Sequence, residues 1–97
     1  MEFYIFARFH AREGQDGAVA ETLGEEIDQT RKEPGCLGIE VYHSTRDRKL
    51  FYIHSRWIDE AAFEAHARLD HNVRFVQTVT PLIDHPLDVT RARPLER

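Results

Sequence analysis

The sequence lacks several features that would point to a particular class of protein. One cysteine among 97 residues excludes an internal disulfide and is typical of a reducing compartment. No apolar run reaches the roughly 18 residues of a membrane span, and no signal-peptide pattern follows Met1. The net charge is −4 without a polybasic run, which argues against nucleic acids and anionic membranes as partners. We therefore expect a cytoplasmic protein that handles small molecules.

The residues that are present suit one small globular domain spanning residues 1–97. Apolar residues make up 41% of the chain, including six phenylalanines, three tyrosines and one tryptophan, which is enough for a core. No internal repeat, linker or low-complexity segment divides the chain.

Alternating apolar residues predict four strands. They cover Met1–Phe9, Cys36–Ser44, Leu50–Trp57 and Leu87–Ala92. Helical spacing predicts an amphipathic helix over Ala18–Lys32, with Asp16 as a possible N-cap and Glu26 among the acidic residues of its polar side.

A second helical region comes in two parts. Asp59 caps a short helix that runs to about Arg68, and another helix opens at Asp70 or His71 and is bent or shortened near Pro81. The order β-α-β-β-α-β predicts an α+β, ferredoxin-like fold, in which a four-stranded antiparallel sheet carries its helices on one face.

The two faces of this sheet differ in what they present. The helix-covered face is mostly apolar and takes Phe3, Ile5, Phe9, Ile39, Val41, Phe51, Ile53 and Trp57. The other face carries many aromatic residues, and a monomer rarely leaves such a patch in water. We therefore predict a homodimer that packs sheet to sheet. Its contact residues would be Tyr4, Phe6, Tyr42, Tyr52 and Arg56. The alternative is a solvated amphipathic face, because tyrosine tolerates water.

The stretch Phe51–His66 is the most informative one for function. Trp57 ends the third strand, and His66 follows on the short helix, so an indole and an imidazole can meet over a small apolar pocket. Trp57 can stack on a planar substrate and donate its N–H to an oxyanion, and His66 can act as a base near neutral pH. Both residues can equally be structural, as a core anchor and a packed histidine.

Trp57 and His66 are the candidate catalytic residues. The candidate substrate-binding residues around them are Phe51, Ser55, Phe63, His71 and Phe75. No metal site is expected, because the histidines show neither H-x-x-x-H nor a Cys/His zinc spacing. No glycine-rich phosphate loop supports a nucleotide, and we expect no cofactor.

Several short motifs together resemble a known family. They are Arg31–Cys36 (RKEPGC), Trp57, Ala65-His66, Asp70-His71 and Arg93-Pro94. The set is similar to the antibiotic biosynthesis monooxygenase family, whose members are dimeric α+β barrels. Some members oxidise phenolic polycycles or quinols with O₂ and use no metal, flavin or haem. The resemblance matches Trp57 to the family's strand-end tryptophan and His66 to its helix histidine. It matches His71 to a histidine often found at the start of the next helix.

The chain departs from the family pattern at two places. Many members carry a glutamate two residues before the tryptophan, where this chain has Ser55. Haem-degrading members use an asparagine on the first strand, which here reads Ile5–Arg8 without one. The missing asparagine argues against haem degradation, and the missing glutamate removes a carboxylate base from that position. On the Trp57 and Ala65-His66 elements, we expect a cofactor-independent monooxygenase acting on a small aromatic or quinol-type molecule. The alternatives are a non-oxidative isomerase of the same fold and a non-catalytic ligand-binding dimer.

Overall fold

The computed structural model describes all residues 1–97, and it has the β-α-β-β-α-β order that the sequence predicts. Its elements are β1 (Phe3–His10), α1 (Asp16–Thr30), β2 (Cys36–His43), β3 (Leu50–Trp57), α2 (Glu60–Ala67), α3 (Asp70–Val79), the 3-10 turn η1 (Thr80–Leu82) and β4 (Asp88–Ala92). The second helical region is divided as expected, and Pro81 falls in the 3-10 turn because proline cannot continue the hydrogen-bond ladder of α3.

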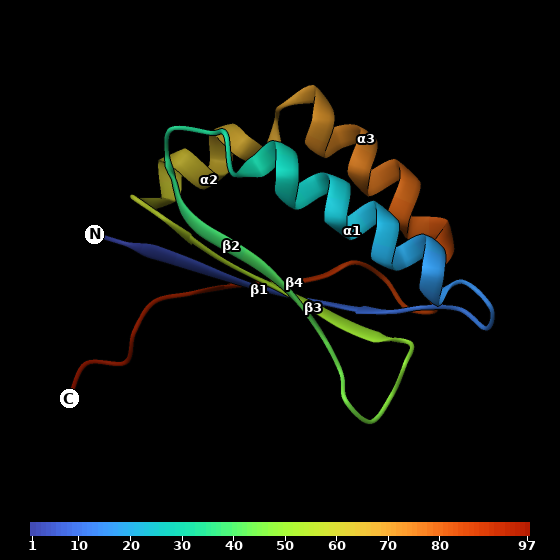
Figure 1. Cartoon of the computed structure of the whole chain (residues 1–97). Helices are drawn as coiled ribbons and strands as arrows, with labels where there is room; N and C mark the ends of the chain where they lie inside the picture. The colour runs from blue at the N-terminus through green and yellow to red at the C-terminus, as the bar shows by residue number, and fades with distance from the viewer.

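The strands form one antiparallel sheet in the order β2-β3-β1-β4. All three helices lie on one face of this sheet and leave the other face bare (Figure 1). The ferredoxin-like fold predicted from the sequence is confirmed. None of the helices combines the length and the apolar content that a membrane crossing requires.

The pleat of the strands sorts the side chains as predicted. The helix-facing residues of β1 and β3 are buried, while Phe6, Tyr42 and Tyr52 on the bare face are 50%, 54% and 41% exposed. Arg56, on the same face, pairs with Glu2 of its own chain at 3.6 Å.

The buried residues form two separate clusters. The larger cluster lies between the sheet and the helices α1 and α3, and it includes Phe9, Leu23, Phe51 and Val79. The smaller cluster consists of Phe3, Ile5 and Trp57, with Ala62 and Phe63 of α2 packed against it. One end of the sheet is therefore covered by α1 and α3, and the other end is covered by α2.

The helix starts differ in how they are capped. Asp59 caps α2, because its Oδ1 accepts a hydrogen bond from the Ala62 N–H at 2.8 Å, as predicted. The prediction of Asp16 as N-cap of α1 is wrong. Asp16 is the first helical residue, and Gln15 precedes the helix without a side-chain cap. Asp16 instead places a negative charge in the first turn of α1, where it interacts favourably with the positive end of the helix dipole.

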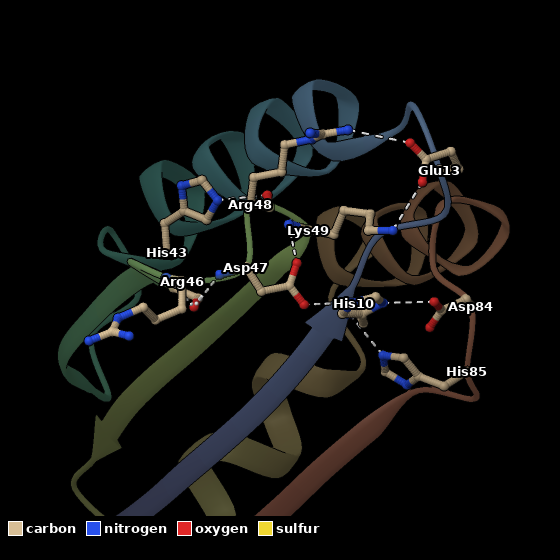
Figure 2. A network of polar contacts seen from close by, with 10 residues as sticks. His10, Glu13, His43, Arg46, Asp47, Arg48, Lys49, Asp84 and His85 are labelled. Carbon is tan, nitrogen blue, oxygen red and sulfur yellow. Dashed lines mark hydrogen bonds and ion pairs between the residues drawn. The ribbon is translucent and has the colours of Figure 1, made fainter.

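His10 joins the end of β1 to two loops that are distant in the sequence (Figure 2). Its Nδ1 lies 2.7 Å from Asp84 Oδ2, and its Nε2 lies 2.9 Å from Asp47 Oδ2. Its backbone N–H donates to His85 Nε2 at 2.9 Å. The hydrogen bonds to Asp84 and Asp47 raise the pKa of His10 above its ordinary 6.5, so the imidazolium is the favoured form between them.

His10 predicts a specific dependence of stability on pH. A histidine whose pKa is raised by folding stabilises the folded state fully below about pH 6.5, and this contribution is lost as the pH rises through the folded pKa. We expect His10→Gln to flatten the fall in unfolding free energy as the pH rises above about 6.5, measured by urea unfolding. His43→Gln is the control, because His43 contacts the Arg48 carbonyl instead of a carboxylate. Equal pH profiles for wild type and His10→Gln would contradict the prediction.

Candidate active site

Two carboxylates and two imidazoles meet where the end of α1 approaches α2 and α3. Glu33 Oε2 lies 2.8 Å from His66 Nδ1 and 2.8 Å from His71 Nε2. Glu26 Oε1 lies 2.9 Å from His71 Nδ1, and Glu26 Oε2 lies 3.7 Å from His66 Nε2. These four residues, Glu26, Glu33, His66 and His71, form a closed arrangement that we call the Glu–His ring.

The predicted position of Glu26 on the polar side of the helix is wrong. The helical pattern assigns it to the polar side of the first helix, yet its exposed fraction is 5%. The buried residues of α1 are Val19, Leu23, Glu26 and Thr30, which follow the spacing of a single helical face. A carboxylate at such a position is costly to bury unless it has a hydrogen-bond partner, and His71 is that partner. Its spacing relative to Leu23 and Thr30 is the signal that could have revealed it.

Glu33 is a second site residue that the sequence does not reveal, although it is the glutamate of the RKEPGC motif. It follows the last turn of α1, so no helical or strand pattern marks it. Its two histidine partners are 33 and 38 residues away in the chain. Residues this far apart in the chain form no recognisable sequence motif. The side chains that meet here, Glu33, His66 and His71, are of types that bind metals, but the sequence shows no metal-binding spacing for them.

The environment shifts the pKa values of the ring. Burial raises the pKa of Glu26 to about 7. Burial lowers the pKa of His66, although its hydrogen bond to Glu33 opposes this. Burial also acts to lower the pKa of His71, but hydrogen bonds to Glu33 and Glu26 outweigh it and the pKa is raised. The ring therefore combines groups that gain and lose protons close to neutral pH.

Trp57 and Phe63 pack against His66, one of the two histidines of the Glu–His ring. The Trp57 ring centroid lies 4.9 Å from that of His66 and 5.8 Å from that of Phe63. The indole N–H donates to Ser55 Oγ at 3.0 Å, so the expectation of a free N–H for a substrate oxyanion is not met. Trp57 is 1% exposed and His66 is 7% exposed. The apolar pocket expected over this pair is closed by the packing of α2.

Phe51 and Phe75 lie elsewhere. Phe51 belongs to the larger core cluster and stacks on His43 with a centroid distance of 4.2 Å. Phe75 packs against the same cluster and meets Phe9 edge-on at 6.0 Å. The structure therefore separates these two phenylalanines from Trp57. The other predicted binding residues are close to the pair, because Ser55 and Phe63 contact Trp57 and His71 lies beside His66.

A hollow of about 470 Å³ lies between α1 and α3 and opens onto the ring. Glu26 and His71 form part of its wall, together with Phe75, Glu25 and Arg74. Most of its lining residues are polar. The hollow therefore gives solvent access to Glu26 and His71 of the ring.

Comparison with known proteins gives a consistent result. The model of the family described as "Antibiotic biosynthesis monooxygenase" matches residues 2–78. Rv0793 of Mycobacterium tuberculosis, which carries a provisional monooxygenase name, is 28% identical over 92 residues, covering 95% of this chain and 90% of that protein.

Solved structures extend the match to the whole fold. The structure of Rv0793 superposes with a TM-score of 0.92 and 26% identity, covering 100% of this chain and 98% of that chain. PA3566 from Pseudomonas aeruginosa gives a TM-score of 0.89 at 26% identity, covering 98% and 95%. SO0527 from Shewanella oneidensis gives 0.87 at 26%, covering 94% and 88%.

Gly35 sets how closely α2 approaches the end of α1. A Cβ at this position would lie 2.5 Å from the Ala62 Cβ, which is far inside van der Waals contact. The Gly35 carbonyl also accepts a hydrogen bond from the Ile58 N–H at 3.0 Å, which fixes the entry to α2. This close approach brings His66 of α2 within reach of Glu33.

Gly35→Ala should therefore destabilise the protein by about 1–3 kcal/mol, because an overpacked contact pushes α2 outward. Gly24→Ala is the matched control, since Gly24 lies within α1 and a methyl group added there meets open space, so alanine should stabilise by about 0.5–1 kcal/mol. Denaturant unfolding of both variants measures the two effects. Effects of the same sign and size would contradict the role given to Gly35.

Proposed function

The chain belongs to the antibiotic biosynthesis monooxygenase family, and we propose that it oxidises a small phenol or quinol with O₂ without a cofactor. Family membership and the name of Rv0793 support a monooxygenase-like action on a small molecule. The substrate class and the independence from cofactors are the further steps of the proposal, and both rest on the family resemblance described above. The geometry of the Glu–His ring supplies the acid and base groups that such a reaction needs.

The observation that carries the proposal is the double position of Glu26. Its side chain lines the hollow between α1 and α3, and the same carboxylate contacts both histidines of the ring. A hollow of about 470 Å³ lies within the range of small-molecule sites. A phenol bound against Phe75 and His71 can give its proton to Glu26. Glu26 Oε2 lies 3.7 Å from His66 Nε2, so onward transfer to His66 requires these two side chains to close to hydrogen-bond distance.

His66 is suited to receive that proton. Its Nδ1 is held by Glu33 at 2.8 Å, which fixes the tautomer and leaves the lone pair on Nε2. The burial that lowers its pKa keeps the imidazole neutral, so its Nε2 lone pair is free, although the same burial makes His66 a weaker base than Glu26, whose pKa is raised to about 7. Trp57 packs on its ring and excludes water from this side of the histidine.

The reaction balances without an external electron donor. Deprotonation gives an electron-rich anion, which transfers electrons to O₂ and forms a carbon–oxygen bond, giving a peroxy anion. Protonation by the ring and cleavage of the O–O bond leave one oxygen atom as a carbonyl on the product. The second oxygen atom leaves as water with the two hydrogens of the substrate. The protein supplies the base, the acid and a site with little water.

A non-oxidative isomerase is the second candidate. The hollow is lined mostly by polar side chains, and Arg74 among them can hold a negative substrate group. A ring that both accepts and returns a proton also suits the interconversion of two carbonyl compounds. This reaction needs no oxygen, so turnover under argon separates it from the first candidate.

We also propose that a second copy of the chain covers the bare sheet face. Phe6, Tyr42, Tyr52 and His54 surround a shallow hollow of about 380 Å³ on this face. No helix covers the face in the chain itself (Figure 1). The family that the sequence motifs resemble consists of dimeric α+β barrels, and a two-fold axis through this face would stack these aromatic side chains on one another.

The activity prediction uses oxygen uptake by chelator-treated protein with a panel of quinols, anthrones and flavonoid-like phenols. Glu26→Gln and His66→Gln should each lower the protein-dependent rate by about 10²-fold or more, because each removes a step of proton transfer. Trp57→Phe should keep a reduced rate. Glu21→Gln is the control, since Glu21 is an exposed acidic residue of α1 that lies outside the hollow. Uptake that is equal in wild type and in Glu26→Gln would show autoxidation and would contradict the assignment.

The dimer prediction uses sedimentation equilibrium. Wild type should sediment with twice the 11.4 kDa mass of the chain, and Tyr52→Glu should sediment as single chains because it places a charge in the aromatic face. Val73→Glu is the matched control, since Val73 is an apolar residue of α3 with a similar exposed fraction of 44%. A monomeric wild type, or dissociation by Val73→Glu alone, would refute the proposed interface.

A further inference from the structure

Three atoms of the Glu–His ring converge in the manner of metal ligands. Glu33 Oε2, His66 Nδ1 and His71 Nε2 offer one donor atom each, and all three lie within 4.8 Å of one another. The oxygen is 2.8 Å from each nitrogen. Two N–H groups thus point at one carboxylate oxygen, and a single dication can take the place of both protons.

The remaining contacts of the ring are those that support ligating histidines. Histidines bound to metals usually donate their second ring N–H to a carboxylate, which fixes the tautomer and the ring orientation. Here His71 turns its Nδ1 to Glu26 Oε1 at 2.9 Å, and His66 turns its Nε2 toward Glu26 Oε2 at 3.7 Å. Glu26 occupies the supporting position for both histidines at once.

We propose that Glu33, His66 and His71 bind one divalent transition-metal ion, with Glu26 as the carboxylate that orients both imidazoles. Two imidazoles and one carboxylate with an open fourth position form a set that Zn²⁺ and Fe²⁺ take in proteins. In a tetrahedral site the ligand atoms stand about 3.3 Å apart, so each oxygen–nitrogen pair must open by roughly 0.5 Å.

The ligands keep limited access to solvent. The side chains of Glu33 and His71 are 13% and 18% exposed, and His71 also lines the hollow between α1 and α3. A hydrated ion can therefore approach the ring from the side of these two residues without unfolding a helix. The site thus combines suitable ligand types, convergent donor atoms, a supporting carboxylate and access from solvent.

The other histidine–carboxylate cluster of the chain does not meet these requirements. At His10 both ring nitrogens face carboxylates, Asp84 and Asp47, which are 44% and 41% exposed. That cluster offers one imidazole nitrogen toward each of two separate carboxylates, so its donor atoms do not converge on one point. It provides the natural comparison for the ring.

This inference does not depend on the oxidation proposed above, and the two can be separated. A metal at His66 Nδ1 leaves the proton on Nε2, where it can no longer accept one from a substrate. The metal-bound ring is therefore inactive in the proposed reaction, and chelator treatment should raise turnover. Metal binding itself is measured without any substrate.

The test titrates metal-free protein with Co²⁺, followed by visible absorption, and with Zn²⁺ in competition with a chromophoric chelator. We expect one ion per chain and the intense absorption of four-coordinate Co²⁺. His71→Gln should weaken Zn²⁺ binding by at least tenfold, and Glu26→Gln by about 10–100-fold through the loss of the supporting carboxylate. His71 borders the hollow, so its replacement disturbs the packing less than replacement of His66.

His10→Gln is the matched control and should leave the affinity unchanged. Circular dichroism of each variant confirms that the fold is intact before titration. The proposal is overturned if wild type binds neither ion. It is equally overturned if folded His71→Gln and Glu26→Gln bind as tightly as wild type, because the ion would then lie elsewhere.

Discussion

One oxygen atom of Glu33 holds the helical layer together. It accepts hydrogen bonds from His66 on α2 and His71 on α3, and Glu33 itself follows the last turn of α1. The three helices are thereby joined at this end through a carboxyl group whose side chain is 13% exposed. Such a group is costly to bury and costlier to leave unpaired, so the arrangement favours one position of the helices over any other. Gly35 makes this possible by letting α2 approach to a distance that no side chain would allow.

The fold could be predicted from the sequence, whereas the site could be predicted only in part. Strand alternation and helical spacing are local properties, and they located every strand and helix to within a few residues. The faces of the sheet followed for the same reason. Trp57, Phe63 and His66 were found together because the strand and helix that carry them are adjacent in the chain.

The carboxylates of the ring escaped prediction for two different physical reasons. Glu26 lies on the buried face of α1, but acidic residues are assigned to the surface unless a partner is known, and its partner is 45 residues away. Glu33 lies in a turn whose position relative to α3 depends on the packing of three helices. In contrast, the grouping of Phe51 and Phe75 with Trp57 failed because the core divides into two clusters, a division that no linear pattern reveals.

That division of the core has a consequence for motion. The cluster around Trp57 is covered by α2, a helix of eight residues, whereas the larger cluster is covered by the longer helices α1 and α3. A short helix that seals few buried side chains opens locally at a lower free energy than the rest of the molecule. The cover over Trp57 is therefore the part of the core expected to open first, and the hydrogen bond between His66 and Glu33 is what holds it closed. Transient lifting of α2 would expose the indole face to a planar ring while the sheet and the larger cluster remain folded.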